Sequence, residues 1–168
     1  MTDMAEVALR LGDDISTDAI YPGRFMATGL PSETPQYCFA DLKEFNARLR
    51  EGKVAAGSVV VGDSNFGTGS SREQAASCMK GYDLVVVAKN YARIFFQNSL
   101  NVGLRLVICP EVEASEGDDL EITTDKVINR TTGKSFDITP LPPARQAILD
   151  AGGLVPYVRK KLLEERAG

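Results

Sequence analysis

The chain has 168 residues, of which 43% are hydrophobic and 25% charged, and its formal net charge at pH 7 is -4. This size fits a single domain over residues 1–168 with one hydrophobic core. The basic residues are scattered rather than gathered in a stripe, which disfavours a nucleic-acid partner. The apolar runs are too short to span a bilayer and the start of the sequence has no export signal. We therefore expect no membrane association and a cytoplasmic protein.

The chain contains no histidine and three cysteines, Cys38, Cys78 and Cys109. Without histidine, this polypeptide cannot build a Ser-His-Asp or Cys-His site alone, and it lacks the commonest metal ligand. The cysteines form no CxxC pair and are odd in number, which favours buried thiols over a disulfide framework. Unless the three cysteines converge in space, we expect this chain to bind no metal and no cofactor by itself.

The predicted elements begin with a strand over residues 6–11. A polar segment follows over residues 13–35, rich in Asp, Gly, Pro, Ser and Thr, which predicts a loop of about twenty residues; loops of that length usually have a function. Residues 39–49 have apolar side chains at helical spacing and predict an amphipathic helix that ends at Gly52.

Two strand–helix–strand units come next. In chain order they are a strand over 58–62, a helix over 71–80, a strand over 83–88, a helix over 91–101 and a strand over 104–109. These strands are almost wholly apolar, which indicates parallel strands covered by helices. Short segments typical of antiparallel strands follow at 120–124, 126–129 and 135–138, and a broken helical region runs from Pro142 to Glu165. The sequence predicts an α/β fold with a parallel strand–helix core and a short antiparallel meander.

The run GDSNFGTGSSREQ, residues 62–74, lies between a predicted buried strand and a predicted helix. In α/β folds, ligand sites are found at such places. Gly67 and Gly69 permit unusual dihedral angles and a close approach of the backbone. Ser70 and Ser71 bring hydroxyls to a helix N-terminus, and Arg72 adds a planar cation suited to a carboxylate or phosphate. The run therefore predicts an anion pocket.

Other interpretations of this run differ in how much they explain. Ser70 and Glu73 match a helix capping box, which accounts for those two residues but not for the glycines, the second serine and Arg72. A phosphate-binding P-loop requires a lysine where Thr68 stands. A dinucleotide-binding fingerprint requires a glycine where Arg72 stands. The capping box therefore stays open, whereas the two nucleotide motifs fail at a required position.

The same run resembles the G-x-G-S-S-R-E turn of the swivelling domain in the aconitase superfamily. Two more segments are similar to that family: GDDISTDAIYPGRF, which starts at Gly12, and AKNYARIFFQNSLNVGL, which starts at Ala88. The three blocks stand in the family's order, and the chain most resembles the free-standing small subunits of isopropylmalate isomerase and homoaconitase. This resemblance implies an aconitase-swivel-like domain and a hydro-lyase or isomerase activity.

The resemblance also implies roles for individual residues. Ser70 matches the family's catalytic base, an alkoxide that removes a proton from the carbon next to a carboxylate. Arg72 matches the arginine that grips a substrate carboxylate. Thr17 and Asp18 match a pair that lines the cleft, although Asp18 would also serve as a simple turn cap. The implied substrate-binding residues are Gly69, Ser71, Arg72, Thr17 and Asp18.

The substrate itself stays open. Phe25, Met26, Ala27 and Thr28 occupy the place of the isomerase's Y-L-R-T specificity loop. Because Ala27 replaces the arginine of that loop, isopropylmalate cannot be assumed, and another 2-hydroxy di- or tricarboxylate, such as homocitrate or dimethylmalate, is equally compatible. Arg93, in the third block, either supports the site or pairs internally.

A partner and a cofactor are implied as well. In the family, a large subunit holds a [4Fe-4S] cluster that binds the substrate hydroxyl. We therefore expect the cluster on a large subunit, in a heterodimer or heterotetramer, and no activity from this chain alone. The alternatives are a non-catalytic anion-binding or regulatory domain and a self-contained enzyme acting on a small anion.

Overall fold

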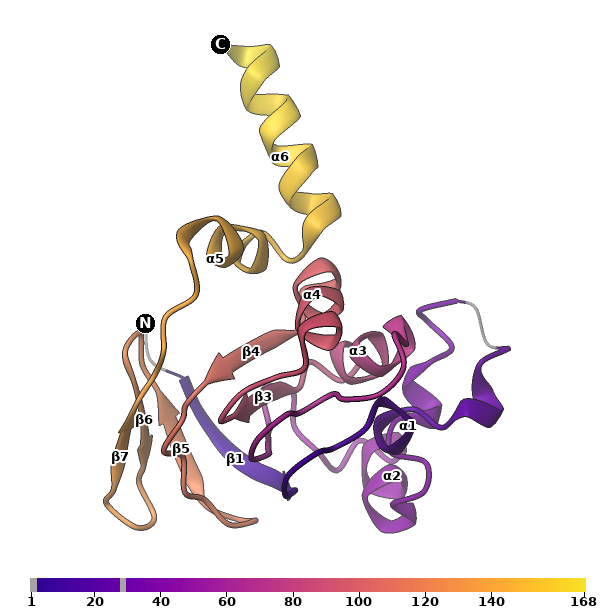
Figure 1. Ribbon diagram of the computed structural model, residues 1–168, viewed down its shortest axis with the longest axis vertical. Coiled ribbons are helices and arrows are strands. Elements are labelled where there is room, and N and C mark those ends of the chain that lie inside the picture. The colour runs from indigo at the N-terminus through magenta and orange to yellow at the C-terminus, as the bar shows by residue number, and fades with distance from the viewer. Residues whose placement is uncertain (1–2, 28–29) are drawn as a thin grey trace.

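The computed structural model describes residues 3–27 and 30–168, and its centre is a mixed β-sheet (Figure 1). The strands of the described residues are β1 (Asp3–Arg10), β2 (Val59–Val61), β3 (Val85–Ala88), β4 (Arg105–Ile108), β5 (Asp119–Ile122), β6 (Lys126–Asn129) and β7 (Ser135–Asp137). Their order in the sheet is β4-β3-β2-β1-β5-β6-β7. Strands β1 to β4 are parallel, and β5 to β7 extend the sheet in antiparallel pairing from the other side of β1. The predicted α/β fold, with a parallel core and an antiparallel meander, is confirmed.

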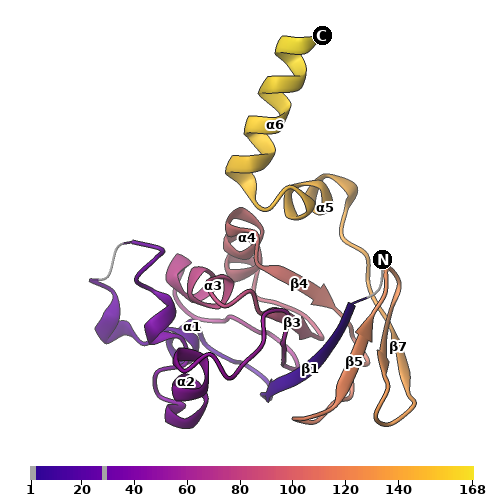
Figure 2. The same ribbon diagram turned by 180° about the vertical axis from the view of Figure 1, so that it is seen from behind.

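Helices lie between and after these strands. In the described part of the chain they are α1 (Thr17–Ile20), α2 (Lys43–Arg50), α3 (Glu73–Lys80), α4 (Arg93–Val102), α5 (Pro143–Asp150) and α6 (Leu154–Ala167), with two 3-10 turns, η1 (Gly23–Phe25) and η2 (Pro35–Tyr37). No helix among the described residues is both long and apolar enough to cross a membrane. Helix α6 projects away from the rest of the molecule in both views (Figures 1 and 2).

Alternation of side chains along the parallel strands divides the core into two layers. Val60 and Val86 lie on the face covered by helices α2, α3 and α4. Val59 and Val85 lie on the opposite face, where Leu120 and other side chains of the antiparallel strands pack against them. Because both faces of the parallel strands are covered, every residue of β2 and β3 is buried. This explains why their sequences are apolar without alternation.

Helices α2, α3 and α4 start later than the sequence predicts, and α4 begins at Arg93 rather than at residue 91. Helix α2 begins at Lys43 rather than Phe39, since Phe39 has a φ of 52° and cannot continue a right-handed helix. Its ring is instead fully buried, 5.6 Å from the ring of Phe45. Helix α3 begins at Glu73 rather than Ser71, because Arg72 is extended (φ -82°, ψ 107°).

The segment predicted as one long loop, residues 13–35, contains short helical elements. Helix α1 and turn η1 both lie within it. Ser16 caps α1, where its Oγ accepts a hydrogen bond of 3.0 Å from the Ala19 N–H. Serine is a common helix N-cap, but a helix of four residues is too short to produce a periodic pattern. The prediction of a loop without helical elements was therefore wrong for this part.

Candidate functional site

The glycine-serine-arginine run, residues 62–72, leaves the carboxyl end of β2 beside the ends of β1 and β3. Asp13, which follows β1, accepts a hydrogen bond of 2.9 Å from the Ser64 N–H through Oδ1. Asn90, which follows β3, accepts from the Asn65 N–H (2.6 Å) and, through its backbone carbonyl, from the Phe66 N–H (3.1 Å). The three similar blocks, separate in the sequence, thus meet at the edge of the parallel sheet where α/β proteins place their ligand sites.

Two glycines shape the turn. Gly67 has a φ of +86°, and a Cβ there would lie 2.1 Å from Cγ of the Phe95 ring, so a side chain cannot fit. Gly69 has a φ of +102°, in the region that favours glycine. The Ile15 carbonyl accepts hydrogen bonds from the N–H groups of Gly67 and Thr68, which tie the turn to the segment before α1. The turn is therefore fixed on both sides before Ser70 is reached.

Ser70 is exposed and stands three residues before the start of α3. The predicted position, after a buried parallel strand and just before a helix, is confirmed. The capping-box interpretation is wrong, because Arg72 is the N-cap residue and no side chain caps this helix. The Ser70 hydroxyl is therefore not used to hold the end of α3.

Thr17 forms hydrogen bonds with Ser70. Only 2% of Thr17 is exposed, and its Oγ1 donates to the Ser70 carbonyl at 3.0 Å. The same oxygen lies 3.4 Å from Ser70 Oγ. The Thr17 N–H donates to the Thr68 carbonyl at 2.8 Å, so backbone and side chain both bind the turn. Buried in this way, Thr17 contacts the serine rather than open space in the cleft.

Asp18, the next residue, holds Arg72. Its Oδ1 accepts a hydrogen bond of 2.6 Å from Arg72 Nη1 and another of 2.8 Å from the Gly23 N–H. The hydrogen bond from Arg72, followed by that from Gly23, lowers the pKa of the Asp18 carboxyl below its ordinary value of 3.8. Asp18 is thus ionised at neutral pH, and it is more than a turn cap.

Arg72 is held in place with part of its guanidinium unused. Its side chain is 18% exposed, and Nη1 also donates to the Tyr21 carbonyl at 3.1 Å. Among the described residues, these hydrogen bonds all come from Nη1. A Cβ on Gly23 would lie 3.0 Å from Nη2, so the glycine leaves the space that this nitrogen occupies. The remaining N–H groups match the two oxygens of a carboxylate.

The other predicted substrate contacts differ in their surroundings. Gly69 and Ser71 are exposed beside Ser70, where a ligand can reach them. Phe25 is half-buried and stacks on Tyr37, with 4.1 Å between the ring centroids, so it serves packing within its segment. Met26 and Ala27 are exposed, and Thr28 lies outside the described residues.

A second ionic cluster lies beside the turn. Asp63 Oδ1 is 2.8 Å from Arg10 Nη2 and 3.5 Å from Lys89 Nζ. Partial burial raises the pKa of the Asp63 carboxyl. The hydrogen bond and charge of Arg10, together with the charge of Lys89, lower this pKa by more, so the net shift is downward. This cluster ties the ends of β1, β2 and β3 together. Arg93 is exposed at the first position of α4 and has no ion pair with the described residues.

The cysteines do not fit an iron–sulfur cluster. All three are fully buried, and Cys109 packs in a different core layer from Cys38 and Cys78. Burial raises the pKa of the Cys38 thiol well above its ordinary value and that of Cys109 to about 11, whereas a cluster ligand must be a thiolate. No group of three His, Cys, Asp or Glu side chains within residues 3–27 and 30–168 is arranged to hold a metal ion.

Sequence reasoning missed two contributions to the site. The Tyr21 carbonyl orients Arg72, and the Gly23 N–H orients Asp18. Both are backbone groups of the Tyr21-Pro22-Gly23 turn, so residue types gave little indication of them. The Pro-Gly dipeptide was the available signal, because it marks a turn that exposes backbone groups.

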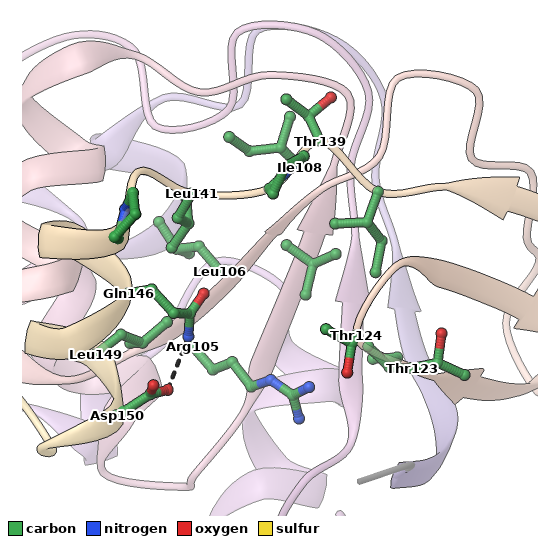
Figure 3. A pocket seen from close by; sticks show the side chains of 15 residues that line it. Arg105, Leu106, Ile108, Thr123, Thr124, Thr139, Leu141, Gln146, Leu149 and Asp150 are labelled. Atoms are coloured by element: carbon green, nitrogen blue, oxygen red, sulfur yellow. Dashed lines mark hydrogen bonds between the residues drawn. The ribbon is translucent and has the colours of Figure 1, made fainter.

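A groove of about 530 Å³ lies elsewhere, between β4, the end of β5 and helix α5 (Figure 3). Leu106, Ile108 and Leu149 are among its lining residues, and Gln146 donates to Asp150 at 2.8 Å along α5. No residue of the run 62–72 lines this groove. None of its lining residues belongs to the three blocks that resemble the family, so the candidate site remains the turn around Ser70 and Arg72.

Known proteins are similar to this chain over most of its length. The Aconitase C-terminal domain family matches residues 38–110. A 3-isopropylmalate dehydratase small subunit of Methanosarcina mazei is 42% identical over 95% of this chain and 98% of its own length. The isopropylmalate/citramalate isomerase small subunit of Methanocaldococcus jannaschii is 38% identical over 94% of each chain.

A solved structure is similar over its whole length. The crystal structure of a 3-isopropylmalate dehydratase from Methanocaldococcus jannaschii superposes with a TM-score of 0.88, at 37% identity, and covers 100% of both chains. This chain and its relatives therefore share sequence identity over nearly the whole length, the fold and the family's motifs. The chain belongs to the family of 3-isopropylmalate dehydratase small subunits, the hydro-lyase subunits of the aconitase superfamily.

Proposed function

We propose that this chain supplies Ser70 as the catalytic base and Arg72 as the carboxylate anchor of the hydro-lyase. One observation carries the proposal: the consecutive residues Thr17 and Asp18 bind Ser70 and Arg72, respectively. A helix cap needs neither contact. The arrangement instead holds a hydroxyl and a cation side by side at an accessible turn, as a reaction next to a carboxylate requires.

The anchor determines which proton is within reach. Free N–H groups of Arg72 bind one carboxylate of a 2-hydroxy di- or tricarboxylic acid in two-pronged geometry. This places the adjacent carbon against Ser70 Oγ, which as an alkoxide takes the proton from that carbon. The exposed N–H groups and hydroxyl of Gly69 and Ser71 are available for the same carboxylate. The electron pair of the broken C–H bond forms the double bond as the hydroxyl leaves the neighbouring carbon as hydroxide, for which a Lewis-acidic cluster on the partner would be the acceptor.

Charge on Ser70 Oγ requires stabilisation in place. The Thr17 hydroxyl, 3.4 Å away, is positioned to turn its proton from the Ser70 carbonyl to the charged oxygen. The start of α3 and the Arg72 guanidinium add positive potential on the same side. Thr17 is therefore a positioning residue for Ser70, and Asp18 is a positioning residue for Arg72.

The proposal includes a partner chain. Because the thiols of this chain do not fit a cluster, we place the [4Fe-4S] cluster on a large subunit, in a cytoplasmic heterodimer or heterotetramer. The two relatives described above are both small subunits, which supports such a partner. Activity should then require both chains. For the substrate, the names of the relatives favour 3-isopropylmalate, an acid of leucine biosynthesis, or citramalate, while Ala27 keeps other 2-hydroxy acids open.

Two substitutions in the complex with the large subunit test the roles. Ser70→Ala should leave substrate binding nearly intact while turnover collapses, since a base acts only in the transition state. Arg72→Lys keeps the charge but loses the two-pronged geometry, so both binding and turnover should fall, by on the order of 2–4 kcal/mol together. A Ser70→Ala complex with normal turnover would remove serine from the mechanism. It would favour the alternative of a non-catalytic anion-binding domain.

A further inference from the structure

Helix α6 exposes apolar side chains with no covering element. It projects from the body in both views, and none of its residues is buried (Figures 1 and 2). Of the ten large hydrophobic side chains that are exposed in the described residues, five lie on α6: Leu154, Val155, Val158, Leu162 and Leu163. An isolated helix of 14 residues is marginally stable in water, and an apolar face of this kind normally marks a contact.

The start of α6 is firmly attached. The Gly153 N–H donates to the Ile148 carbonyl at 3.0 Å. Gly103, at the end of α4, packs so closely on Gly152 that an added Cβ would lie 2.3 Å from the Gly152 oxygen. With its base held against α4 and α5, the helix extends about 21 Å in a defined direction. It is therefore suited to reach into another chain.

The charges on α6 indicate which kind of surface on the other chain would bind it. Val155, Val158 and Leu162 follow a spacing of three and four residues and form one line on the helix, here called the α6 stripe. At 100° per residue, Lys161 flanks this stripe on one side, and Arg159 and Arg166 flank it on the other. A single acid, Glu165, stands at the C-terminal end of the stripe.

These flanks argue against pairing with a second copy of α6. Residues beside an apolar seam face their counterparts across a helix pair, and like charges there oppose association. Two copies would bring basic flanks together in either orientation, and the single glutamate beside each stripe, Glu165, is too little to neutralise them. The helix has four basic and two acidic residues, whereas the whole chain has a net charge of -4. Its charge thus fits an acidic surface.

We propose that the α6 stripe docks into an apolar groove with an acidic rim on the large subunit. The proposal rests on the proposed function for the existence of that partner. Recognition follows the helix-in-groove mode, in which apolar anchors give affinity and rim charges give specificity and rate. Fourteen residues bury less than a standard interface, so α6 acts as an anchor beside the contacts made near Ser70.

The test measures the dissociation constant of the full chain for the purified large subunit by titration calorimetry. Leu162→Glu should raise this constant on the order of tenfold or more, because it places a charge in the stripe against an acidic rim. Leu163→Glu is the matched control: this leucine is also exposed, 63% against 51% for Leu162, but lies 100° around the helix, and its substitution should leave the constant unchanged. Arg159→Glu should also weaken binding and reduce its dependence on salt.

Circular dichroism and the oligomeric state of the free chain complete the design. All three glutamate variants should keep the wild-type helix content, and the free chain should be monomeric. An unchanged constant for Leu162→Glu would overturn the proposal. So would a dimer of the free chain that Leu162→Glu dissociates without affecting the large subunit, since a second copy would then be the occupant. Ser70→Ala separates the two ideas: it should assemble normally but be inactive, and an active variant would contradict the proposed function alone.

Discussion

Replacing Thr17 by valine tests how the site holds its serine. Valine has nearly the shape of threonine but no hydroxyl, so the Ser70 carbonyl loses the hydrogen bond of 3.0 Å from Thr17. That carbonyl keeps a second hydrogen bond, 2.9 Å from the Arg72 N–H, and is not left unsatisfied. The cost to folding should therefore be that of one ordinary hydrogen bond, about 1 kcal/mol. For a chain of this size it should lower the melting temperature by roughly 2–4 °C.

The effect of Thr17→Val on turnover should be larger. If the Thr17 hydroxyl stabilises charge on Ser70 Oγ, its loss removes a hydrogen bond to a charged group, worth about 1.5–3 kcal/mol. The turnover number of the complex should fall roughly 10- to 100-fold, with little change in the Michaelis constant.

Thr17→Ser is the control for this prediction. It keeps the hydroxyl and removes one buried methyl group, which should cost about 1 kcal/mol of stability. The two variants should therefore melt at similar temperatures but differ in turnover. Steady-state kinetics with the large subunit in excess, together with melting curves, make the comparison. Equal turnover numbers for the two variants would refute the positioning role of Thr17.

Three more predictions follow from the same region and from the core. Gly67→Ala should cost roughly 2–4 kcal/mol, since it adds a Cβ at a φ of +86° against Phe95, and a free energy of unfolding within 0.5 kcal/mol of wild type would contradict the packing. The Asp18 carboxyl should titrate below 3.8 in a carbon NMR experiment, and Arg72→Gln should move its pKa back upward. Because the pKa of Asp18 is lower in the folded than in the unfolded protein, the pair with Arg72 stabilises the fold at any pH above the ordinary pKa. This stabilisation is lost as the pH falls through the lowered pKa of the folded state. The Cys109 thiol, fully buried and with its pKa raised to about 11, should react with a thiol reagent at pH 8 only as fast as the protein unfolds; rapid labelling of folded protein would show that it is accessible.

The sequence predicts those elements of the fold whose local pattern is compatible with only one kind of structure. The apolar runs that become β2 and β3 indicated parallel strands because both faces of such strands must be covered. The start of α2 could not be foreseen, since the φ of Phe39 depends on packing of its ring against Phe45. Helix α1 was missed because four residues carry no periodicity.

The sequence alone determined which residues form the candidate site. The glycines, Ser70 and Arg72 stand together in one turn, and their chemistry predicts an anion pocket whatever the rest of the chain does. The absence of histidine, also a property of sequence alone, excluded the common catalytic triads. The family's motifs then implied the base and the anchor.

The tertiary structure decided how those residues are held. Thr17 and Asp18 lie more than fifty positions before the groups that they bind, and no local pattern specifies contacts at that separation. They arise because the parallel pairing of β1 with β2 brings the segments after these strands to one edge of the sheet. Whether the Ser70 hydroxyl caps a helix or contacts Thr17 depended on the same pairing. Once Arg72 reaches out to Asp18, its extended backbone delays the helix to Glu73, and Ser70 is left outside it.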